Sequence, residues 1–550
     1  MDSRAVLELI DQRNRDWRDE RLADSELDLF DGDMRYVGAL YNHIDEEFEW
    51  VENDTGSASV SLPRDHYLVR WVTNHQGREK RDIHIRFRKQ GAQWDGRLET
   101  YKLRRDRDGE ITLELIFKHC FEELKHILVW CNPFTPAALQ FPRIFAIFGK
   151  LDWCMAVTLW LNVARLEAGL FMIPGDPFDP DQWPEFDMTE WSICVVPVDF
   201  ASSAAPLGYL WSRFGTYFDT VEKALKRSQL SIDCRRWYEG DPVPEGLGFT
   251  PRHGALIVRF VDNSGWLTQT SFFGSVLTGL ERAVVEIADD GATENISVVS
   301  GDPTFPDEYY EPGWFGSRPQ APAIVLEDDG ESGIIESEFE YFPASDFQHV
   351  AGGQSFPGID EGISAAVVTT GNFAGSFVQL PGYGVGLSGL GAAVDAVAKP
   401  LYAGTVGAWM NVPAFERETD FGRFGYKERR AGGDIRAGTL GAFAAVYSSI
   451  ITTRERTGHR VKFSDSLCWR IGPPGFGDMW IGTRVAVRPS GVPDEYALYC
   501  EQVRRINYQR DRDGKVSWES DIGWKEPDDP FLALYGAVRD FGAMVGAAGL

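Results

Sequence analysis

A β-hairpin is predicted by the stretch Tyr101-Lys-Leu-Arg-Arg-Asp-Arg-Asp-Gly-Glu-Ile-Thr-Leu-Glu-Leu115. Its second half alternates apolar and polar residues, which is the two-residue period of a strand that buries one face. The Asp-Gly pair at 108–109 supplies the positive φ angles that a tight turn needs. This stretch therefore indicates two antiparallel strands joined by a short loop.

A related stretch lies near the other end of the chain, Ile506-Asn-Tyr-Gln-Arg-Asp-Arg-Asp-Gly-Lys-Val-Ser-Trp-Glu-Ser520. The two stretches share Arg-Asp-Arg-Asp-Gly at 105–109 and 510–514, followed in both by alternation. Two related β domains would explain the match. Two hairpins that independently acquired good turn residues would explain it as well, and both interpretations stay open. An EF-hand is excluded, since its further acidic ligands are missing.

The rest of the chain indicates a mainly β protein with α+β insertions. Alternation predicts strands, and longer amphipathic or apolar runs predict helices. The strands are expected at 66–72, 83–87, 111–117, 255–261 and within 460–524, and the helices at 121–130, 143–168, 220–230 and 439–453. A chain of 550 residues exceeds what one core usually organises. The expected units are an N-terminal β domain over 1–125, a mixed α/β insertion and second β region over 126–350, a Gly/Ala-rich and helical region over 351–458, and a C-terminal β region over 459–550.

The chain is strongly acidic. Its 55 basic and 83 acidic residues give a formal charge of −28, which argues against wrapping nucleic acid or docking on an anionic membrane. A negative wall would still let DNA slide past without sticking. The alternative is that the charge only aids solubility, and this stays open.

The cysteines predict neither disulfides nor a zinc site. They are seven in number, widely spaced and without a C-x-x-C pair, so reduced core thiols and assembly in a cytoplasm are expected. Met1–Ile10 lacks the basic start and apolar run of a signal peptide. The apolar stretch Ile144–Leu166 contains Lys150, Asp152 and Arg165, which a bilayer span would tolerate poorly.

The segment Gly362–Asn411 has an unusual composition for so acidic a protein. Only Asp395 and Lys399 are charged, and Gly and Ala dominate. Such a segment is expected to be covered by something, whether a subunit interface, the axis of an oligomer or a membrane met during infection.

No residue earns a catalytic, cofactor-binding or metal-binding assignment. The nine histidines show no metalloprotease spacing; His119 and His126 could share a helix face, but core or surface histidines explain them better. The loop Gly175–Trp191 gathers acidic residues that a glycosidase could use, yet a solvated loop is the simpler interpretation. Gly382-Tyr-Gly-Val-Gly386 follows Pro381 rather than a strand and is weak evidence for a phosphate loop. We expect no cofactor.

The middle of the chain resembles a known family. The stretches Leu128-Val-Trp-Cys-Asn-Pro-Phe-Thr-Pro-Ala-Ala-Leu-Gln-Phe-Pro-Arg143 and Ile173-Pro-Gly-Asp-Pro-Phe-Asp-Pro-Asp-Gln-Trp183 are similar to the minor tail proteins of mycobacteriophages and related actinophages. Further similar stretches follow in the same order, at 353–366, 399–402, 452–459, 475–485 and 524–530. The resemblance spans nearly the whole chain, but its motifs mark lineage rather than a chemical site.

The resemblance implies a structural protein and not an enzyme. Members look like hub proteins of the tail tip, or baseplate, of a siphovirus, which implies two tail-tube-like β-barrel domains per chain and a homotrimer that continues the hexameric tail tube. The implied partners are the distal tail protein, the tape-measure protein and other minor tail proteins, with genomic DNA passing transiently without specific binding and with contact to the host envelope during infection. The implied location is the virion tail tip, after assembly in the host cytoplasm.

Two other functions stay in view. A tail-associated cell-wall hydrolase would degrade the host wall as purified protein, and the missing catalytic motif counts against it. A receptor-binding tip protein would adhere directly to host cells, and the missing fibre-like repeats count mildly against it.

Overall fold

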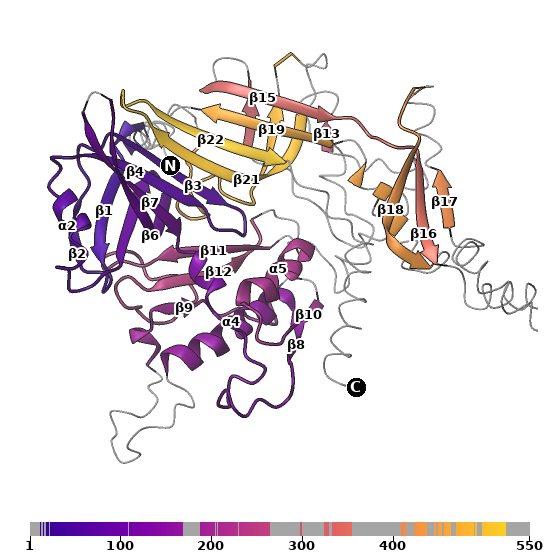
Figure 1. The fold of residues 1–550 in the computed structure, drawn as a ribbon, viewed down its shortest axis with the longest axis horizontal. Coiled ribbons are helices and arrows are strands. Elements are labelled where there is room, and N and C mark those ends of the chain that lie inside the picture. The colour runs from indigo at the N-terminus through magenta and orange to yellow at the C-terminus, as the bar shows by residue number, and fades with distance from the viewer. Residues whose placement is uncertain are drawn as a thin grey trace, which may run out of the picture.

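A computed structural model gives the arrangement of the chain (Figure 1). The described residues are 12, 15, 18–20, 22–107, 109–168, 187–263 without 204, 206 and 229, then 297–299, 324–328, 333–354, 409–413, 422, 424–436, parts of 445–453, 456–463, 469–488, 490–491 and 498–523. Strands dominate these residues, and fourteen of them belong to one sheet. The expected fold class, mainly β with α+β insertions, is confirmed.

The first strand set is formed by the N-terminal part of the chain. Its strands are β1 (Glu26–Asp31), β2 (Tyr36–Ala39), β3 (Asp45–Val51), β4 (Ser57–Pro63), β5 (Ile83–Lys89), β6 (Ala92–Arg105) and β7 (Ile111–His119). They pair antiparallel in the order β3-β4-β7-β6-β5-β1-β2. Alternating burial along β3 and β4 shows that one face of this set packs into the core.

The prediction of a strand at 66–72 is wrong. These residues form a turn followed by the short helix α2 (Val69–Thr73). Leu68 and Val72 are both buried, and the Val72 amide donates to the Leu68 carbonyl at 2.9 Å. A spacing of four residues between buried side chains is helical. The apolar side chains of Tyr67, Val69 and Trp71, which lie two apart, misled the prediction because a stretch of seven residues is too short to separate a strand period from a helical one.

The second strand set comes from the C-terminal half. Its strands are β13 (Ser297–Val299), β14 (Ile324–Glu327), β15 (Ile334–Phe342), β19 (Arg456–Phe463), β20 (Arg484–Arg488), β21 (Leu498–Arg510) and β22 (Val516–Gly523). The order is β15-β19-β22-β21-β20-β14, with β13 on β21. β14 and β20 run parallel, whereas every other pair in this set is antiparallel.

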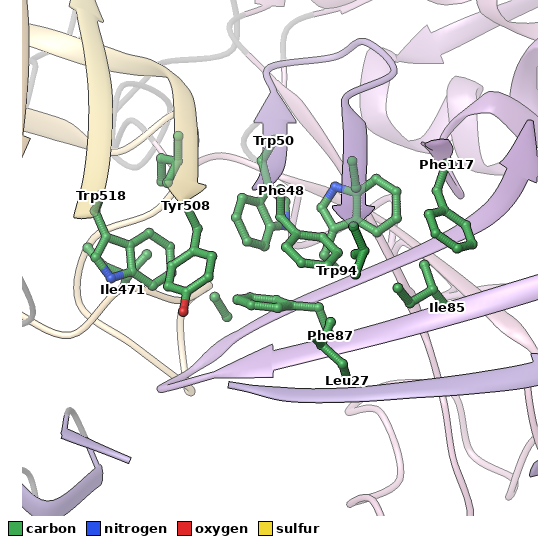
Figure 2. Close-up of a cluster of buried hydrophobic side chains, with 14 of the residues drawn as sticks. Leu27, Phe48, Trp50, Ile85, Phe87, Trp94, Phe117, Ile471, Tyr508 and Trp518 are labelled. Atoms are coloured by element: carbon green, nitrogen blue, oxygen red, sulfur yellow. The ribbon is translucent and has the colours of Figure 1, made fainter. Parts of the chain in front are cut away.

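One hydrophobic core serves both strand sets. β3 pairs antiparallel with β21, so the two sets form a continuous sheet although the paired residues lie more than 450 positions apart. Figure 2 shows the aromatic side chains gathered beneath this pairing, where Trp50 stacks on Trp518 with ring centroids 6.1 Å apart and Phe87 lies 4.8 Å from Tyr508. Burying aromatic rings supplies a large share of the stability of such a core.

An α/β insertion lies against the first strand set (Figure 1). It contains α3 (Glu122–Lys125), β8 (Phe145–Lys150), α4 (Leu151–Glu167), β9 (Ile193–Val195), β10 (Leu207–Ser212), α5 (Tyr217–Ser228), β11 (Ser231–Arg236) and β12 (Leu256–Val261). α4 packs against the strands of two small sheets, β8-β10 and β11-β12-β9. It is buried around much of its circumference, which explains its nearly uniform apolar sequence.

The insertion corrects two predicted helix boundaries. The helix predicted over 143–168 begins only at Leu151, because 145–150 form β8 and pair with β10. Lys150 is extended, and its backbone marks the change from strand to helix. The helix predicted over 121–130 is only one turn, α3. The helix predicted at 220–230 corresponds to α5, and the strand predicted at 255–261 to β12.

A fourth sheet, β17-β16-β18, lies beyond the end of β15 (Figure 1). It consists of β16 (Gln348–Gln354), β17 (Trp409–Pro413) and β18 (Glu428–Arg436). Only the last residues of the Gly/Ala-rich segment 362–411 belong to it, and 362–408 lie outside the described residues. Within the described part of the chain, no helix is long and apolar enough to cross a membrane.

Candidate functional site: the junction between the two strand sets

The two Arg-Asp-Arg-Asp-Gly stretches form matching turns. In the first, the Asp106 amide donates to the Glu110 carbonyl at 3.0 Å, the Asp106 carboxylate accepts from the Glu110 amide at 2.8 Å, and Gly109 has φ +91°. The second turn repeats each feature. The Asp511 amide donates to the Lys515 carbonyl at 3.0 Å, the Lys515 amide donates to the Asp511 carboxylate at 2.9 Å, and Gly514 has φ +75°. Both loops therefore satisfy their backbone groups in one way, with glycine where φ is positive.

The likeness extends well beyond the turns. The β6–β7 ladder has a bulge between Leu98 and Thr100, and the β21–β22 ladder has one between Val503 and Arg505. Leu98 and Val503 each lie seven residues before the arginine that opens the turn. A bulge re-aims a strand and depends on its own local sequence, so two unrelated hairpins would not be expected to share its position. The shared bulge favours duplication over independent turns.

The neighbours of the two hairpins also correspond. β4 pairs with β7 as β19 pairs with β22, β3 pairs with β4 as β15 pairs with β19, and β5 pairs with β6 as β20 pairs with β21. β3 and β15 even share a sequence signal, Glu47-Phe-Glu-Trp50 against Glu338-Phe-Glu-Tyr341. Sequence reasoning missed this second repeat, and the shared Glu-Phe-Glu followed by an aromatic residue is the signal that could have found it.

The junction of β3 with β21 buries its apolar side chains on one face. Tyr508 lies opposite Phe48 and Ile506 lies opposite Trp50. All four side chains are buried, and Tyr508 donates its hydroxyl to the buried carboxylate of Glu46 at 3.2 Å. Because the paired residues come from both strand sets, this face fixes the register between the two sets.

The opposite face of the junction is polar on β21, with one arginine, and acidic on β3. Arg505 donates to Glu49 at 2.5 Å and to Asp521 of its own hairpin at 3.3 Å. Burial lowers the pKa of Arg505, but the Glu49 and Asp521 carboxylates outweigh burial and raise it above the usual value. Asn507 donates to Glu47 at 2.9 Å. Cross-strand pairs of opposite charge select one partner and one register.

A buried polar cluster anchors the α/β insertion on β6. The Asp95 carboxylate accepts the Tyr238 hydroxyl at 2.8 Å, the Arg236 amide at 3.0 Å and the Gln93 side chain at 2.7 Å. Arg236 in turn binds Glu123. Burial raises the pKa of Asp95, and these hydrogen bonds oppose the shift. A carboxylate whose partners all come from the protein interior serves as a structural tie rather than as an open acid or base.

The structure does not bring the candidate histidines together into a site. His119 lies half-buried against Trp94, and burial lowers its pKa to about 3. His126 is exposed beside Glu122. No group of three potential metal ligands occurs among the residues with described positions. Most of the acidic loop, 175–186, and the glycine-rich 382–386 lie outside the described residues. Asp187 caps the short 3-10 helix Met188–Glu190 by accepting from the Thr189 amide.

Five of the cysteines are buried free thiols, namely Cys120, Cys131, Cys154, Cys194 and Cys234. Burial raises the pKa of Cys154 and that of Cys194 to about 12. Such thiols are poor nucleophiles at neutral pH and act as small apolar side chains.

Comparisons with known proteins give the lineage. Residues 26–524 match the family described as Siphovirus ReqiPepy6 Gp37-like protein. The chain is 40% identical to the minor tail protein Gp28 of Mycobacterium phage D29 and 40% identical to that of Mycobacterium phage L5, in each case over 96% of both chains.

Solved structures align with most of the chain at low similarity. The tail protein from Neisseria meningitidis MC58 has a TM-score of 0.37 and 8% identity, covering 93% of this chain and 99% of its own. The 43 kDa tail protein of prophage MuSo2 from Shewanella oneidensis has a TM-score of 0.38 and 10% identity, covering 92% and 99%. From the family match and the two relatives, the chain belongs to the Siphovirus ReqiPepy6 Gp37-like family and is an actinobacteriophage minor tail protein, a component of the virion tail.

Proposed function

We propose that this minor tail protein is the hub of the siphovirus tail tip. Three copies form a ring at the end of the tail tube, and each contributes both of its strand sets. Six related units then meet the six-fold tube above. The observation that carries the proposal is the duplicated hairpin with its shared turn and bulge, because a trimer matches a hexameric tube only if each chain supplies two like units.

The ring has a mechanical role in this proposal. It connects the tube to the tip, holds the end of the tape-measure protein and contacts the distal tail protein and other minor tail proteins. The path along its axis lets the tape-measure protein and then DNA leave. The formal charge of −28 supports this role, since a polyanion moves past an acidic wall without binding it.

In this proposal the two strand sets are the tube-like units. Their strands close into a β-barrel only when the copies assemble into the ring. Among the described strands of a single chain, the main pairing path runs from β15 to β2 without returning on itself. The Gly/Ala-rich segment 362–411 is proposed to lie at the trimer axis or at a subunit interface. The division at 1–125, 126–350, 351–458 and 459–550 stays a prediction.

We also propose that the role is structural rather than catalytic. The support is that the buried Asp95 carboxylate is engaged by hydrogen bonds from within the protein, and that His119 lies half-buried against Trp94. Hydrolysis of cell wall by the purified protein would contradict this part of the proposal, and adhesion of the purified protein to host cells would favour the receptor-binding alternative.

The test is the mass and symmetry of the native complex. Light scattering on purified protein and imaging of tail tips from lysed virions should give three copies in a ring at the end of the tube. A monomer that is absent from the tail tip would overturn the proposal.

A further inference from the structure

The outer halves of β6 and β21 have different surroundings although the strands correspond. In β21, Tyr499–Gln502 pair with β20, and Arg505–Arg510 pair with β3 across the junction. In β6, Ala92–Arg97 pair with β5 in the same way. Among the described strands, the next half of β6, Thr100–Arg105, pairs with β7 on one side and has no strand on the other. The unit built on β6 therefore presents the edge that β21 uses to bind β3.

The complementary edge is β15. β15 corresponds to β3, and within the described part of the main sheet it pairs with β19 alone. The equivalence of β15 and β3 shows which of their residues match. In the first strand set, Phe48 pairs with Ala58, which pairs with Phe117. In the second strand set, Phe339 pairs with His459, which pairs with Ile522. Phe117 and Ile522 match each other, because they pair with Leu98 and Val503, the residues at the two corresponding bulges. Phe339 in β15 therefore corresponds to Phe48 in β3.

The register across the junction can be transferred to these two edges. Tyr508 lies opposite Phe48, and the residue that matches Tyr508 in β6 is Leu103. Leu103 of one chain would therefore lie opposite Phe339 of another. In the same register, Lys102 of one chain would lie opposite Glu340 of the other, and Arg104 would lie opposite Glu338.

Exposure supports this pairing. Tyr508 is fully buried by the junction, whereas Leu103 at the matching place is 55% exposed. Trp50 is 5% exposed, whereas Tyr341 at its matching place is 54% exposed. Large apolar side chains at these positions are buried where a partner strand is present. The exposure of Leu103 and Tyr341 therefore marks two strand edges that a partner strand would cover.

Charge supports the same pairing. The outer half of β6 carries Lys102, Arg104 and Arg105, whereas β15 carries Glu336, Glu338 and Glu340. Arg104 already binds Glu114 of its own hairpin at 2.9 Å, and Glu338 contacts Arg460 at 3.5 Å. This does not remove them from the interface, since Arg505 binds Asp521 of its own hairpin and Glu49 across the junction at once.

We propose that the basic edge of β6 in one copy pairs antiparallel with the acidic edge of β15 in a second copy, with Lys102 opposite Glu340 and Arg104 opposite Glu338. The contact repeats the β21–β3 junction between chains. It joins unlike edges, so it continues head to tail and must either close into a ring or extend as a filament. Closure after three copies rests on the proposed function, whereas the strand pairing rests on the edges themselves.

Disulfide cross-linking in assembled particles tests the register. A chain with Lys102→Cys and Glu340→Cys should form disulfides between copies under mild oxidation, because facing residues lie within disulfide reach. The expected product on a non-reducing gel is a covalent trimer. The matched control carries Lys102→Cys with Glu336→Cys, which moves the second thiol four residues, or roughly 13 Å, along the strand and should not cross-link. The unaltered chain controls for native thiols.

Charge reversal tests the same contact independently. Lys102→Glu with Arg104→Glu should weaken assembly at least about tenfold, because like charges would then face each other across the strands. Adding Glu338→Lys and Glu340→Lys to that chain should restore assembly. Rescue excludes misfolding as the cause of the loss.

The outcomes separate the two proposals. Trimers at the tail tip without the 102–340 cross-link, or with equal cross-linking of the control, would overturn the strand pairing and leave the hub function standing. The cross-link in an open filament or in a ring of another number would support the pairing and overturn the trimeric hub.

Discussion

The two hairpins, β6–β7 and β21–β22, share a backbone but differ in what covers their outer edge. Both have the same five-residue loop, the same positive-φ glycine and the same bulge. The β21 edge buries Ile506 and Tyr508 against β3, whereas the β6 edge leaves Leu103 exposed. The difference teaches that the duplicated backbone is kept for its geometry, while side chains on the edges decide which partner each copy meets.

Matched truncations should give the largest contrast between the hairpins. Tyr508→Ala removes a fully buried aromatic ring and should lower the free energy of unfolding by about 3–5 kcal/mol. Leu103→Ala at the matching place should cost less than about 1 kcal/mol in the monomeric chain. Denaturant titration at low protein concentration measures both. Equal losses at the two positions would break the comparison.

Acid should reveal a second contrast, between the histidines of the two strand sets whose pKa is lowered. Burial lowers the pKa of His84 and of His119 in the first set to about 3, and that of His459 in the second to about 4. These histidines are neutral when folded but bind a proton when unfolded below about pH 6.5. Their stabilising contribution is therefore complete at neutral pH and is lost as the pH falls from about 6.5 toward the folded pKa.

The measurement is the pH dependence of unfolding in histidine variants. His119→Phe should reduce the loss of stability between pH 7.5 and 5.5 by about 1.4 kcal/mol, and His459→Phe should do the same. Removing both first-set histidines should have about twice the effect of removing His459. An unchanged pH dependence in His119→Phe would show that this ring is protonated in the folded chain.

The turn glycines should show the smallest contrast, because here the two hairpins are alike. Gly109 and Gly514 have φ angles of +91° and +75°, which cost an L residue about 1–2 kcal/mol. Gly109→Ala and Gly514→Ala should each lower the free energy of unfolding by about that amount, and by the same amount within a few tenths. Thermal unfolding of both variants checks this, and a clear inequality would mean that the loops differ in strain.

Local signals made much of this fold predictable. The Asp-Gly pairs and the alternation after them predicted both hairpins, and the apolar run around Leu159 predicted the buried helix α4. The prediction failed where a period was too short to read, as at His66–Val72, and where a strand ran directly into a helix at Lys150.

The junction itself could not be predicted from local pattern. The pairing of Val51 with Arg505 joins two strands that are remote in sequence, and no local sequence pattern around either residue indicates its partner. Only comparison of the repeats could have suggested it, because Glu47-Phe-Glu-Trp50 and Glu338-Phe-Glu-Tyr341 show that β3 and β15 belong to equivalent places. The family resemblance supplied the lineage but not these contacts.

The pairing of β3 with β21 also sets the order of events during synthesis. β3 leaves the ribosome early, but its partner is translated more than 450 residues later, a delay of about 20–90 s at about 5–20 residues per second. Through that interval the acidic strand has no β21 to cover it, and a premature pairing with another nascent chain would trap both. The glutamates of Asp45–Val51 repel an identical strand, so the same charges that hold the finished junction together also keep unfinished chains apart.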